Sequence, residues 1–452
     1  MKKFKIVCAL TLLATLSVSV CALAKKTNKP VQSAPHNTLG KADKDGFYTL
    51  FNGKNLSGWF GSTDKYSVKD GVMHCKKGAK GMLLHRQRFD DFHLKFDFKL
   101  TPGANNGLAI RAPKKGDPAN TAMELQILDN SAAKYANLKP YQYHGSVYGL
   151  VPAKKGALKK VGEWNHQEVI AEGTKLKVIL NGEVILEADL AEKVKGHTGK
   201  IAKNCAKRIR GFIGWANHGD ELFFRNIKIK PIDTYAKGEH NIAPKGFKPL
   251  FNGKDLTGWK GRPHYSPYKF ASLSADKQKA EQKKWNADMR KHWTVKDGAI
   301  VNDGKGVFLT TNKKYKDFEL LIDYKTVAKA DSGIYLRDNP QVQIWDYTKA
   351  GRKWHYGADK GSGGLWNNTK NARFPKVLAD KPFGMWNRMR IKLVGDKVSV
   401  WLNGELVVDN VTMENYFNRR AKLFDSGHIQ LQTHGGEIQW RNVFIKELPR
   451  KK

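Results

Sequence analysis

The chain has 452 residues, about three times the ~150 residues of a typical domain, so two or three domains are expected. Lys and Arg total 80 against 42 Asp and Glu, which gives a net charge of +38. Hydrophobic residues make up 40% of the chain, which excludes wholesale disorder, and 42 Gly without a Gly-X-Y period exclude a collagen-like chain. Four cysteines are too few for a disulfide scaffold. We therefore expect a basic globular protein of several domains.

The N-terminal segment has the features of a signal peptide. Three lysines among the first five residues precede an apolar run over residues 6–20, and Ala22-Leu23-Ala24 offers the small residues of a cleavage site. We expect residues 1–24 to be removed, residues 25–45 to form a polar spacer, and the mature protein to be secreted or periplasmic. No second long apolar run follows, so no transmembrane segment is expected after signal removal.

The mature chain would keep two cysteines, Cys75 and Cys205. Export permits a disulfide between them, and two buried free thiols are the equal alternative.

The positive charge suggests several kinds of partner. Basic domains bind nucleic acid through its phosphates, but the lysines here are scattered along the whole chain. No zinc-finger spacing, basic leucine zipper or RNA-binding signature is found, so no nucleic-acid partner is expected. A solvated cationic surface is the favoured interpretation, and attraction to acidic glycans or to an acidic cell envelope is compatible with it.

An internal repeat determines the domain organisation. The segment Leu50–Trp59 returns as residues 250–259, and further matches follow in the same order down both halves. Among them, Asn106-Gly107 through Arg111 matches Ser332-Gly333 through Arg337, and Trp-Asn, Leu-Asn-Gly and Arg-Asn segments recur later. We therefore predict two homologous domains, repeat one over 46–233 and repeat two over 246–449, joined by a linker over 234–245.

Each repeat has the pattern of antiparallel β-structure. Apolar and polar residues alternate from Phe92 to Leu100 and again from Phe318 to Tyr324, a period of two with one buried face. Asn181-Gly182 and Asn403-Gly404 each stand between two alternating runs, which predicts type I′ hairpins. Many short strands favour a β-sandwich in each half. The Ala-, Lys- and Gln-rich stretch 274–290 predicts a helix in an insertion over about 272–291 of repeat two, interpreted as a solvated helix on the rim.

These segments resemble a known family. The opening Leu-Phe-Asn-Gly-Lys-x-Leu-x-Gly-Trp, the segment 124–130, and the Leu-Asn-Gly and Phe-Arg-Asn-Ile segments are similar, in order, to the 3-keto-disaccharide hydrolase domain over nearly all of both halves. The resemblance implies an all-β fold of two tandem concanavalin A-like jelly-roll sandwiches, related to laminarinase-type glycoside hydrolases. It also implies an exported enzyme that acts on carbohydrate, namely glycosides or oligosaccharides whose sugar is oxidised at C3.

The best chemical candidate in repeat one is Glu124-x-Gln126-x-x-Asp129. On a strand, residues 124 and 126 share one face, and a bulge before 129 would return its side chain to that face. The spacing resembles the Glu-x-Asp-x-x-Glu strand of laminarinase-type enzymes, which use two carboxylates. Since Gln126 cannot ionise, this two-carboxylate mechanism is in doubt. A polar strand edge without catalytic role is the alternative.

Repeat two keeps less of this motif. Aligned through Gln-Ile, the positions of Glu124, Gln126 and Asp129 become Gln341, Gln343 and Asp346. Only one carboxylate remains, so repeat one is the better catalytic candidate.

A different chemistry fits the residues that both repeats share. A ketone at C3 acidifies the C2 proton, so one base and one enolate-stabilising group suffice for elimination of the C1 substituent, followed by hydration. His218 and His434 are candidate bases, with Asp129 and Asp346 as further catalytic candidates. Arg111 and Arg337 are candidates for binding the enolate oxygen.

Further substrate-binding candidates are the polar and aromatic residues of the same segments: Gln126, Tyr148, Gln341, Gln343 and Trp366. A divalent metal ion is compatible with His218, Glu124 and Asp129, or with His434, Asp346 and Gln343, although no short ligand cluster exists. Two function classes stay open: a hydrolase or lyase of 3-keto-glycosides, and a non-catalytic pair of carbohydrate-binding sandwiches.

Overall fold

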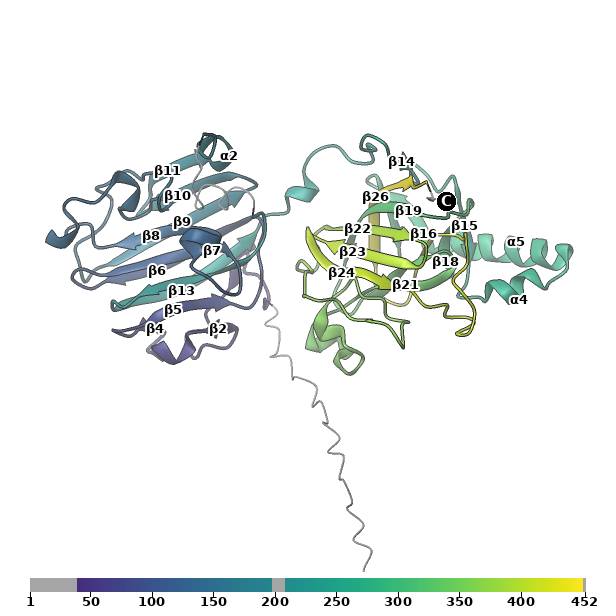
Figure 1. Ribbon diagram of the computed structural model, residues 1–452, viewed down its shortest axis with the longest axis horizontal. Helices are drawn as coiled ribbons and strands as arrows, with labels where there is room; N and C mark the ends of the chain where they lie inside the picture. Colours follow the sequence, from purple (N-terminus) through teal and green to yellow (C-terminus); the bar gives the residue numbers. More distant parts are fainter. Residues whose placement is uncertain (1–38, 197–207, 450–452) are drawn as a thin grey trace, which may run out of the picture. The chain divides into compact units, whose positions relative to one another are not determined.

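The computed structural model describes residues 39–196 and 208–449 (Figure 1). The predicted signal peptide, most of the predicted spacer and Cys205 lie outside these residues. Within them, each repeat contains one large and one small antiparallel sheet packed face to face. This arrangement confirms the predicted all-β fold of two jelly-roll sandwiches. Cys75 is buried and forms no disulfide with another described residue.

The larger sheet of repeat one has the order β11-β10-β9-β6-β13-β4-β3, and β1 also pairs with β13. Its strands are β1 (Tyr48–Thr49), β3 (Tyr66–Lys69), β4 (Val72–Cys75), β6 (Phe92–Leu100), β9 (Trp164–Glu172), β10 (Lys175–Leu180), β11 (Glu183–Asp189) and β13 (Leu222–Pro231). The smaller sheet has the order β2-β5-β12-β7-β8. Its strands are β2 (Trp59–Gly61), β5 (Lys80–His85), β7 (Asn105–Ala112), β8 (Met123–Leu128) and β12 (Phe212–His218). Two short helices, α1 (Pro118–Thr121) and α2 (Leu190–Lys193), lie in the connections.

Repeat two has the same topology, with a larger sheet β16-β17-β26-β19-β22-β23-β24, to which β14 pairs, and a smaller sheet β15-β18-β25-β20-β21. The strands of the larger sheet are β14 (Lys248–Pro249), β16 (Trp293–Lys296), β17 (Ala299–Asn302), β19 (Phe318–Thr326), β22 (Asn387–Val394), β23 (Lys397–Leu402), β24 (Glu405–Thr412) and β26 (Ile438–Glu447). The smaller sheet contains β15 (Trp259–Arg262), β18 (Phe308–Thr311), β20 (Asp331–Leu336), β21 (Asn339–Trp345) and β25 (Gln430–Leu431).

The core of each sandwich lies between its two sheets. In β6, Phe92, Leu94, Phe96 and Phe98 are completely buried while the residues between them are partly exposed, as the alternation predicts. In the smaller sheet, the residues that face this core are also apolar, for example Leu125 in β8. The opposite face of the smaller sheet is therefore free to carry polar side chains.

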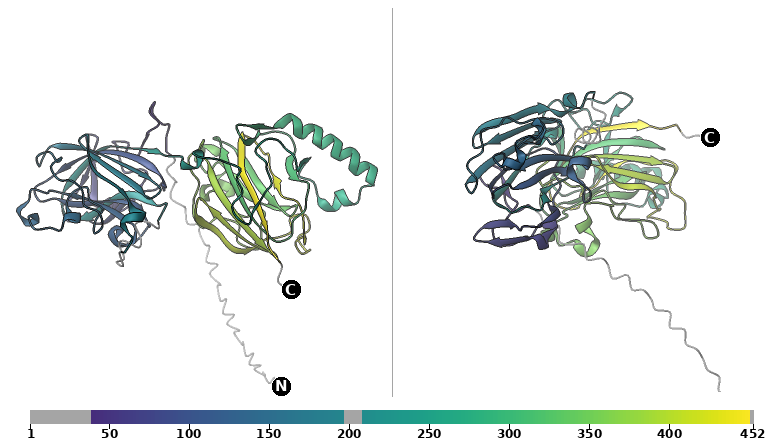
Figure 2. Two further views of the ribbon diagram at one scale, coloured as in Figure 1. Left: turned by 90° about the horizontal axis from the view of Figure 1, so that it is seen from above. Right: turned by 60° about the vertical axis from the view of Figure 1, so that its left-hand side comes forward.

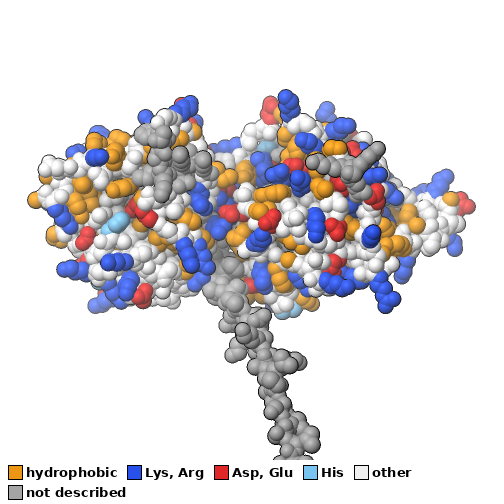
Figure 3. Space-filling view, in the orientation of Figure 1, with side chains coloured by type: hydrophobic (Ala, Val, Ile, Leu, Met, Phe, Trp, Pro, Cys, Tyr) orange, Lys and Arg blue, Asp and Glu red, His pale blue; other side chains and the backbone are white. Residues whose placement is uncertain are grey.

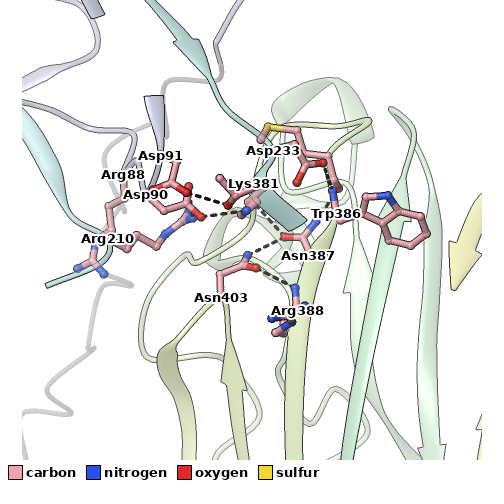
Figure 4. A network of polar contacts seen from close by, with 12 residues as sticks. Arg88, Asp90, Asp91, Arg210, Asp233, Lys381, Trp386, Asn387, Arg388 and Asn403 are labelled. Atoms are coloured by element: carbon pink, nitrogen blue, oxygen red, sulfur yellow. Dashed lines mark hydrogen bonds and ion pairs between the residues drawn. The ribbon is translucent and has the colours of Figure 1, made fainter. Parts of the chain in front are cut away.

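A pair of asparagines fastens the predicted hairpin in each repeat. In repeat two, Asn387 Oδ1 accepts hydrogen bonds from the Lys381 amide (2.9 Å) and from Asn403 Nδ2 (2.8 Å), and the Arg388 amide donates to Asn403 Oδ1 (2.9 Å) (Figure 4). Asn403 stands at φ 51°, the left-handed conformation that the hairpin turn requires. Asn165 and Asn181 form the same contact in repeat one, at 2.9 Å. The recurring Trp-Asn and Leu-Asn-Gly segments thus serve the scaffold.

The close-up in Figure 4 also contains an ionic cluster around Asp90. Its carboxylate lies 3.6 Å from Arg210 Nη1 and 2.9 Å from Lys381 Nζ, and both basic side chains are almost fully buried. Buried charges need such partners, because an unpaired one costs several kcal/mol.

The predicted helix of repeat two is α5 (Ala275–His292), preceded by the short α4 (Pro267–Ala271), and Figures 1 and 2 show α5 beside the second sandwich. It is more than a solvated rim element. Gln282 Nε2 donates to the Gly261 carbonyl (2.8 Å), and the Gly261 amide donates to Asn286 Oδ1 (2.9 Å). Gly261 lies in β15, the edge strand of the smaller sheet, so α5 supplies hydrogen-bond partners that an edge otherwise lacks.

The visible surface carries many basic side chains. Figure 3 shows Lys and Arg side chains spread over the visible face of both repeats, in keeping with their scatter in the sequence. Among the described residues, no helix has the length and apolar character needed to cross a membrane.

Candidate active site

The candidate site lies on the face of the smaller sheet of repeat one that points away from the core. In β8, Leu125 and Ile127 belong to the core, so Glu124 and Gln126 project from the opposite face. In β12, Trp215 belongs to the core, and His218, the last residue of the strand, projects to the same side as Glu124. The alternation of these strands therefore places a carboxylate and an imidazole together.

Glu124 and His218 are in contact. Glu124 Oε1 lies 3.2 Å from His218 Nε2, and the two side chains are 3% and 43% exposed, respectively. The hydrogen bond with Glu124 is the largest cause that raises the pKa of His218 above its ordinary value, against the opposing effect of burial. Among the described residues, Nδ1 is the His218 nitrogen without a protein partner, so it is available to a substrate.

Gly107 makes this contact possible. It lies on β7, opposite Gln126 of β8 and opposite Ala216 of β12, so the Glu124 side chain must cross it to reach His218. A Cβ atom at this position would lie 1.8 Å from Glu124 Oε1. The glycine of the repeated Asn106-Gly107 segment is thus needed because it leaves room for the Glu124 side chain, and not because of a turn.

A groove of about 580 Å³ opens beside His218. Lys114 and Lys115, on the loop between β7 and α1, line it together with His218. The other lining residues are Gly61, Ser62, Gly81, Met82, Gly116, Asp117, Pro118, Ala216 and Asn217. Small residues form much of its wall, and two lysines supply positive charge. Sequence reasoning missed these lysines, because nothing in the sequence separates them from the many others of a chain with net charge +38.

Gln126 and Tyr148 lie close to this pair. Gln126 Nε2 donates to Asn105 Oδ1 (2.9 Å), and the Tyr148 amide donates to the Glu124 carbonyl (3.0 Å). The Tyr148 hydroxyl accepts from Gln142 Nε2 (3.2 Å). Both residues remain substrate-binding predictions, since they adjoin Glu124 on its face of the sheet.

Asp129 is placed differently from the prediction. The pairing of β7 with β8 is regular, so the expected bulge is absent, β8 ends at Leu128, and Asp129 leaves the Glu124 face. Its Oδ2 accepts from the Gly103 amide (2.8 Å), and its Oδ1 accepts from the amide (3.0 Å) and hydroxyl (2.6 Å) of Ser131. Burial would raise the pKa of Asp129, but these hydrogen bonds outweigh it and hold the pKa below its ordinary value. The carboxylate fastens the loop after β8.

Arg111 and Arg337 also serve the scaffold. Arg111 donates to the Asp90 carbonyl (2.8 Å), the Gly173 carbonyl (2.6 Å) and Asp91 Oδ1 (2.8 Å). Arg337 donates to the Lys316, Gly395 and Phe424 carbonyls and contacts Asp317. The two residues are 3% and 1% exposed, and these contacts give no support to the predicted binding of an enolate oxygen. Their recurrence together with Asp91 and Asp317 reflects a shared buried ion pair.

Repeat two has a histidine–carboxylate pair that sequence analysis missed. His434 Nδ1 lies 2.8 Å from Asp331 Oδ2, and Lys353 Nζ also contacts this carboxylate. Gln343 Nε2 donates to Asp331 Oδ1 (2.7 Å) and Gln341 donates to Gln343. The predicted residues Gln341, Gln343 and His434 thus come together, around an aspartate one residue before the matched Ser332-Gly333.

Asp346 and Trp366 do not join this pair by any described contact. Asp346 accepts from the Lys329 and Thr348 amides, each at 2.7 Å, and so repeats the loop-fastening role of Asp129. The Trp366 ring is half-buried and is covered by the Arg373 guanidinium at 3.8 Å.

The metal grouping suggested for repeat one, of His218 with Glu124 and Asp129, is not formed in the described residues. Among residues 39–196 and 208–449, no three His, Cys, Asp or Glu side chains lie close enough together to hold a metal ion. Asp129 is held away from Glu124 and His218 by its own loop, and Gln343 is engaged with Asp331.

Several proteins are similar to this chain. A 3-keto-disaccharide hydrolase from Bacteroides thetaiotaomicron is 28% identical over 253 residues, which span 47% of this chain and 87% of that protein. A solved structure from Parabacteroides distasonis, whose name assigns it provisionally to the glycosyl hydrolases, is 31% identical and covers 41% of this chain and 99% of its own, with a TM-score of 0.37. A carbohydrate-binding module from Bacillus subtilis is 15% identical, covers 38% of this chain and 95% of its own, and has a TM-score of 0.30.

The family comparison covers both repeats. Residues 46–230 and 246–446 each match the model of one domain family, so most of the chain is accounted for. The chain belongs to the family of the 3-keto-alpha-glucoside-1,2-lyase-like domain, of which it carries two tandem copies.

Proposed function

We propose that this chain cleaves glycosides whose sugar ring carries a ketone at C3, and that repeat one does so with His218 as the base. The observation that carries the proposal is the Glu124–His218 contact of 3.2 Å beside a groove that also holds Lys114 and Lys115. The description of the family as 1,2-lyase-like and the name of the Bacteroides relative support this substrate class.

The chemistry needs one base and one cation. A ketone at C3 makes the C2 proton acidic, and His218 takes that proton through Nδ1 while Glu124 stabilises the resulting imidazolium. The C2–H electron pair forms an enolate, whose negative charge on the C3 oxygen is stabilised by a groove lysine.

The enolate then expels the leaving group. As the ketone re-forms, a C1=C2 double bond is made, the C1–O bond breaks, and the departing alkoxide receives the proton from His218. Addition of water, with hydroxyl at C1 and hydrogen at C2, gives the free 3-keto sugar. The sum of the two steps is hydrolysis.

Two features disfavour the laminarinase-type alternative. A retaining glycosidase needs two carboxyl groups about 5–5.5 Å apart across the bond that is cleaved. Here Glu124 is 3% exposed beneath His218, and both oxygens of Asp129 accept hydrogen bonds from the Gly103 amide and Ser131. Glu124 therefore acts through His218 as a positioning residue.

Cleavage in D₂O tests this proposal. The full chain is given a 3-keto-glucoside and the parent glucoside, and the released sugar is analysed by mass spectrometry and NMR. We expect much faster release from the ketone and one deuterium at C2, with free 3-keto sugar and no enzyme as the control for background exchange. Comparable release from both substrates without label at C2 contradicts the proposal in favour of direct hydrolysis, and binding without release favours a carbohydrate-binding protein.

We further propose that the protein is exported, because of its lysine-rich start, apolar run and Ala22-Leu23-Ala24. Fractionation of expressing cells, followed by N-terminal sequencing, checks this. A chain that begins near Lys25 in the periplasm or medium is expected, and an intact cytoplasmic chain contradicts it.

A further inference from the structure

Repeat two places a carboxylate where repeat one has an amide. If the register of β7 with β12 is continued by one residue, Asn105 lies opposite His218. If the register of β20 with β25 is continued past Leu431, Asp331 lies opposite His434, and the two side chains are in contact at 2.8 Å. Each accepts a hydrogen bond from the corresponding glutamine: Gln126 donates to Asn105 at 2.9 Å and Gln343 donates to Asp331 at 2.7 Å. The two positions are therefore equivalent in both sequence and structure.

At the position of Glu124, repeat two has an amide side chain in place of the carboxylate. Gln341 takes the position of Glu124, opposite Tyr335 as Glu124 is opposite Ala109. Its side chain also crosses a glycine, since a Cβ at Gly333 would lie 2.8 Å from Gln341 Oε1. Each repeat thus keeps one carboxylate beside the histidine, on β8 in repeat one and on β20 in repeat two.

Asp331 acts on His434 as Glu124 acts on His218. The 2.8 Å hydrogen bond with Asp331 is the largest cause that raises the pKa of His434. The His434 side chain is 63% exposed, so a substrate can reach it, whereas that of Asp331 is 10% exposed. Lys353 pairs with Asp331 and supplies a cation, as Lys114 and Lys115 do in the groove of repeat one.

Two further observations indicate a ligand at this position. Gln341 Oε1 is buried, in a residue 4% exposed, and has no hydrogen-bond partner among the described residues, so it lacks a donor such as a sugar hydroxyl. The ring centroid of His264 lies 5.3–5.4 Å from those of Tyr335 and Tyr416. Burial is the largest cause that lowers the pKa of His264, and the charge of His434 is the second. Tyr335 is buried, but Tyr416 is 37% exposed, so its ring offers a face on which a pyranose can pack.

We propose that repeat two carries a second, independent site for 3-keto-glycosides, in which His434 is the base and Asp331 is its positioning carboxylate. This inference rests on the proposed function of repeat one and extends it to the second copy. The same elimination and hydration apply, with the C2 proton taken by His434 and returned to the departing alkoxide.

Turnover of the full chain with one site removed tests the proposal. His218→Ala is expected to leave measurable cleavage of the 3-keto-glucoside, and adding His434→Ala is expected to reduce that remainder by about 10²-fold or more. Adding Asp331→Asn instead is expected to reduce it by at least ~10-fold, while Asp409→Asn, a carboxylate on the surface of repeat two paired with Lys376, leaves it unchanged. If His218→Ala alone abolishes all cleavage by an active wild-type chain, the second site is excluded while the proposed function stands. An inactive wild-type chain contradicts both.

Two measurements separate a positioning role from a structural one. NMR titration of His434 is expected to show a lower pKa in Asp331→Asn than in wild type and no change in Asp409→Asn. In a chain that carries His434→Ala and Glu124→Gln, the addition of Asn105→Asp is expected to raise turnover by at least ~10-fold. An unchanged titration of His434, or no recovery by Asn105→Asp in a folded chain, contradicts the equivalence of the two carboxylate positions.

Discussion

Glu124 reaches His218 because the residue that it crosses, Gly107, has no side chain. A Cβ at Gly107 would lie 1.8 Å from the carboxylate oxygen, a separation that the contact cannot survive without displacement of Glu124. The activity proposed for repeat one therefore depends on a residue that has no chemistry of its own.

Gly107→Ala is expected to lower the kcat of repeat one at least as far as Glu124→Gln, by ~10-fold or more, because the displaced carboxylate no longer meets His218. The measurement is kcat for the 3-keto-glucoside in a His434→Ala background, with circular dichroism to confirm folding. Gly333→Ala is the matched control, since it stands at the same position in repeat two. Unchanged kcat in a folded Gly107→Ala protein would show that the Glu124 contact is dispensable.

The pH dependence of kcat/KM reports the state of His218. The base form is lost as pH falls through the pKa of His218, which Glu124 raises, so the acidic limb of the profile should lie above pH ~6.5. Glu124→Gln removes the largest cause of that increase, so the limb should move to lower pH. A profile that does not move, recorded in the His434→Ala background, would assign the limb to another group.

Asp129 and Glu124 should respond in opposite ways to the same substitution. Asp129→Asn weakens hydrogen bonds to the Gly103 amide and to Ser131, and is expected to lower the free energy of unfolding by about 1–3 kcal/mol with little effect on kcat. Glu124→Gln is expected to lower kcat with a smaller effect on stability. Urea unfolding and steady-state kinetics on both variants check this pattern. A large loss of kcat in a stable Asp129→Asn protein would show that Asp129 takes part in the reaction.

Lys114 and Lys115 provide the positive charge of the groove. Replacing both with Gln should lower kcat by ~10-fold or more, because the charge that develops on the C3 oxygen is no longer stabilised. Lys76→Gln and Lys77→Gln together change the net charge equally and are the control, with both double variants measured in the His434→Ala background. Equal kcat values for the two double variants would exclude a specific role for the groove lysines.

His144 makes repeat one sensitive to acid. It is 2% exposed, and burial, the largest cause, lowers its pKa to about 4. Between this value and the ordinary pKa of about 6.5, the unfolded chain binds a proton that the folded chain does not. The contribution of His144 to stability is therefore constant above about pH 6.5 and falls as pH decreases toward 4, by on the order of 3 kcal/mol. Urea unfolding across this range should show a shallower pH dependence for His144→Gln than for the exposed control His355→Gln, and identical slopes would contradict this role.

The fold could be predicted from the sequence because its signals are local. The alternation of β6 and the Asn-Gly turns depend only on neighbouring residues, and the repeat doubled the evidence for each. Glu124 was named as a candidate from its spacing with Gln126, and His218 from its recurrence as His434, but their contact with each other was not predicted.

The rest of the site could not be predicted, because a residue recurs in both repeats when the fold requires it as well as when the reaction requires it. Arg111 recurs as Arg337 owing to a buried ion pair, and Asp129 recurs as Asp346 owing to a loop. Asp331 was missed for the converse reason. It differs from its counterpart Asn105, and its relation to His434 depends on pairing between strands about 100 residues apart in the chain.

The exchange of Glu124 and Asn105 for Gln341 and Asp331 also constrains how the two copies diverged. Single substitutions lead from one arrangement to the other through a histidine with no carboxylate or a histidine with two. The second places a further negative charge beside the buried Glu124 or Asp331. A single-copy ancestor would pass through an impaired site by either route. After duplication, one repeat could pass through the impaired intermediate while the other repeat remained active. The tandem arrangement therefore allows one carboxylate position to be exchanged for the other without loss of all activity.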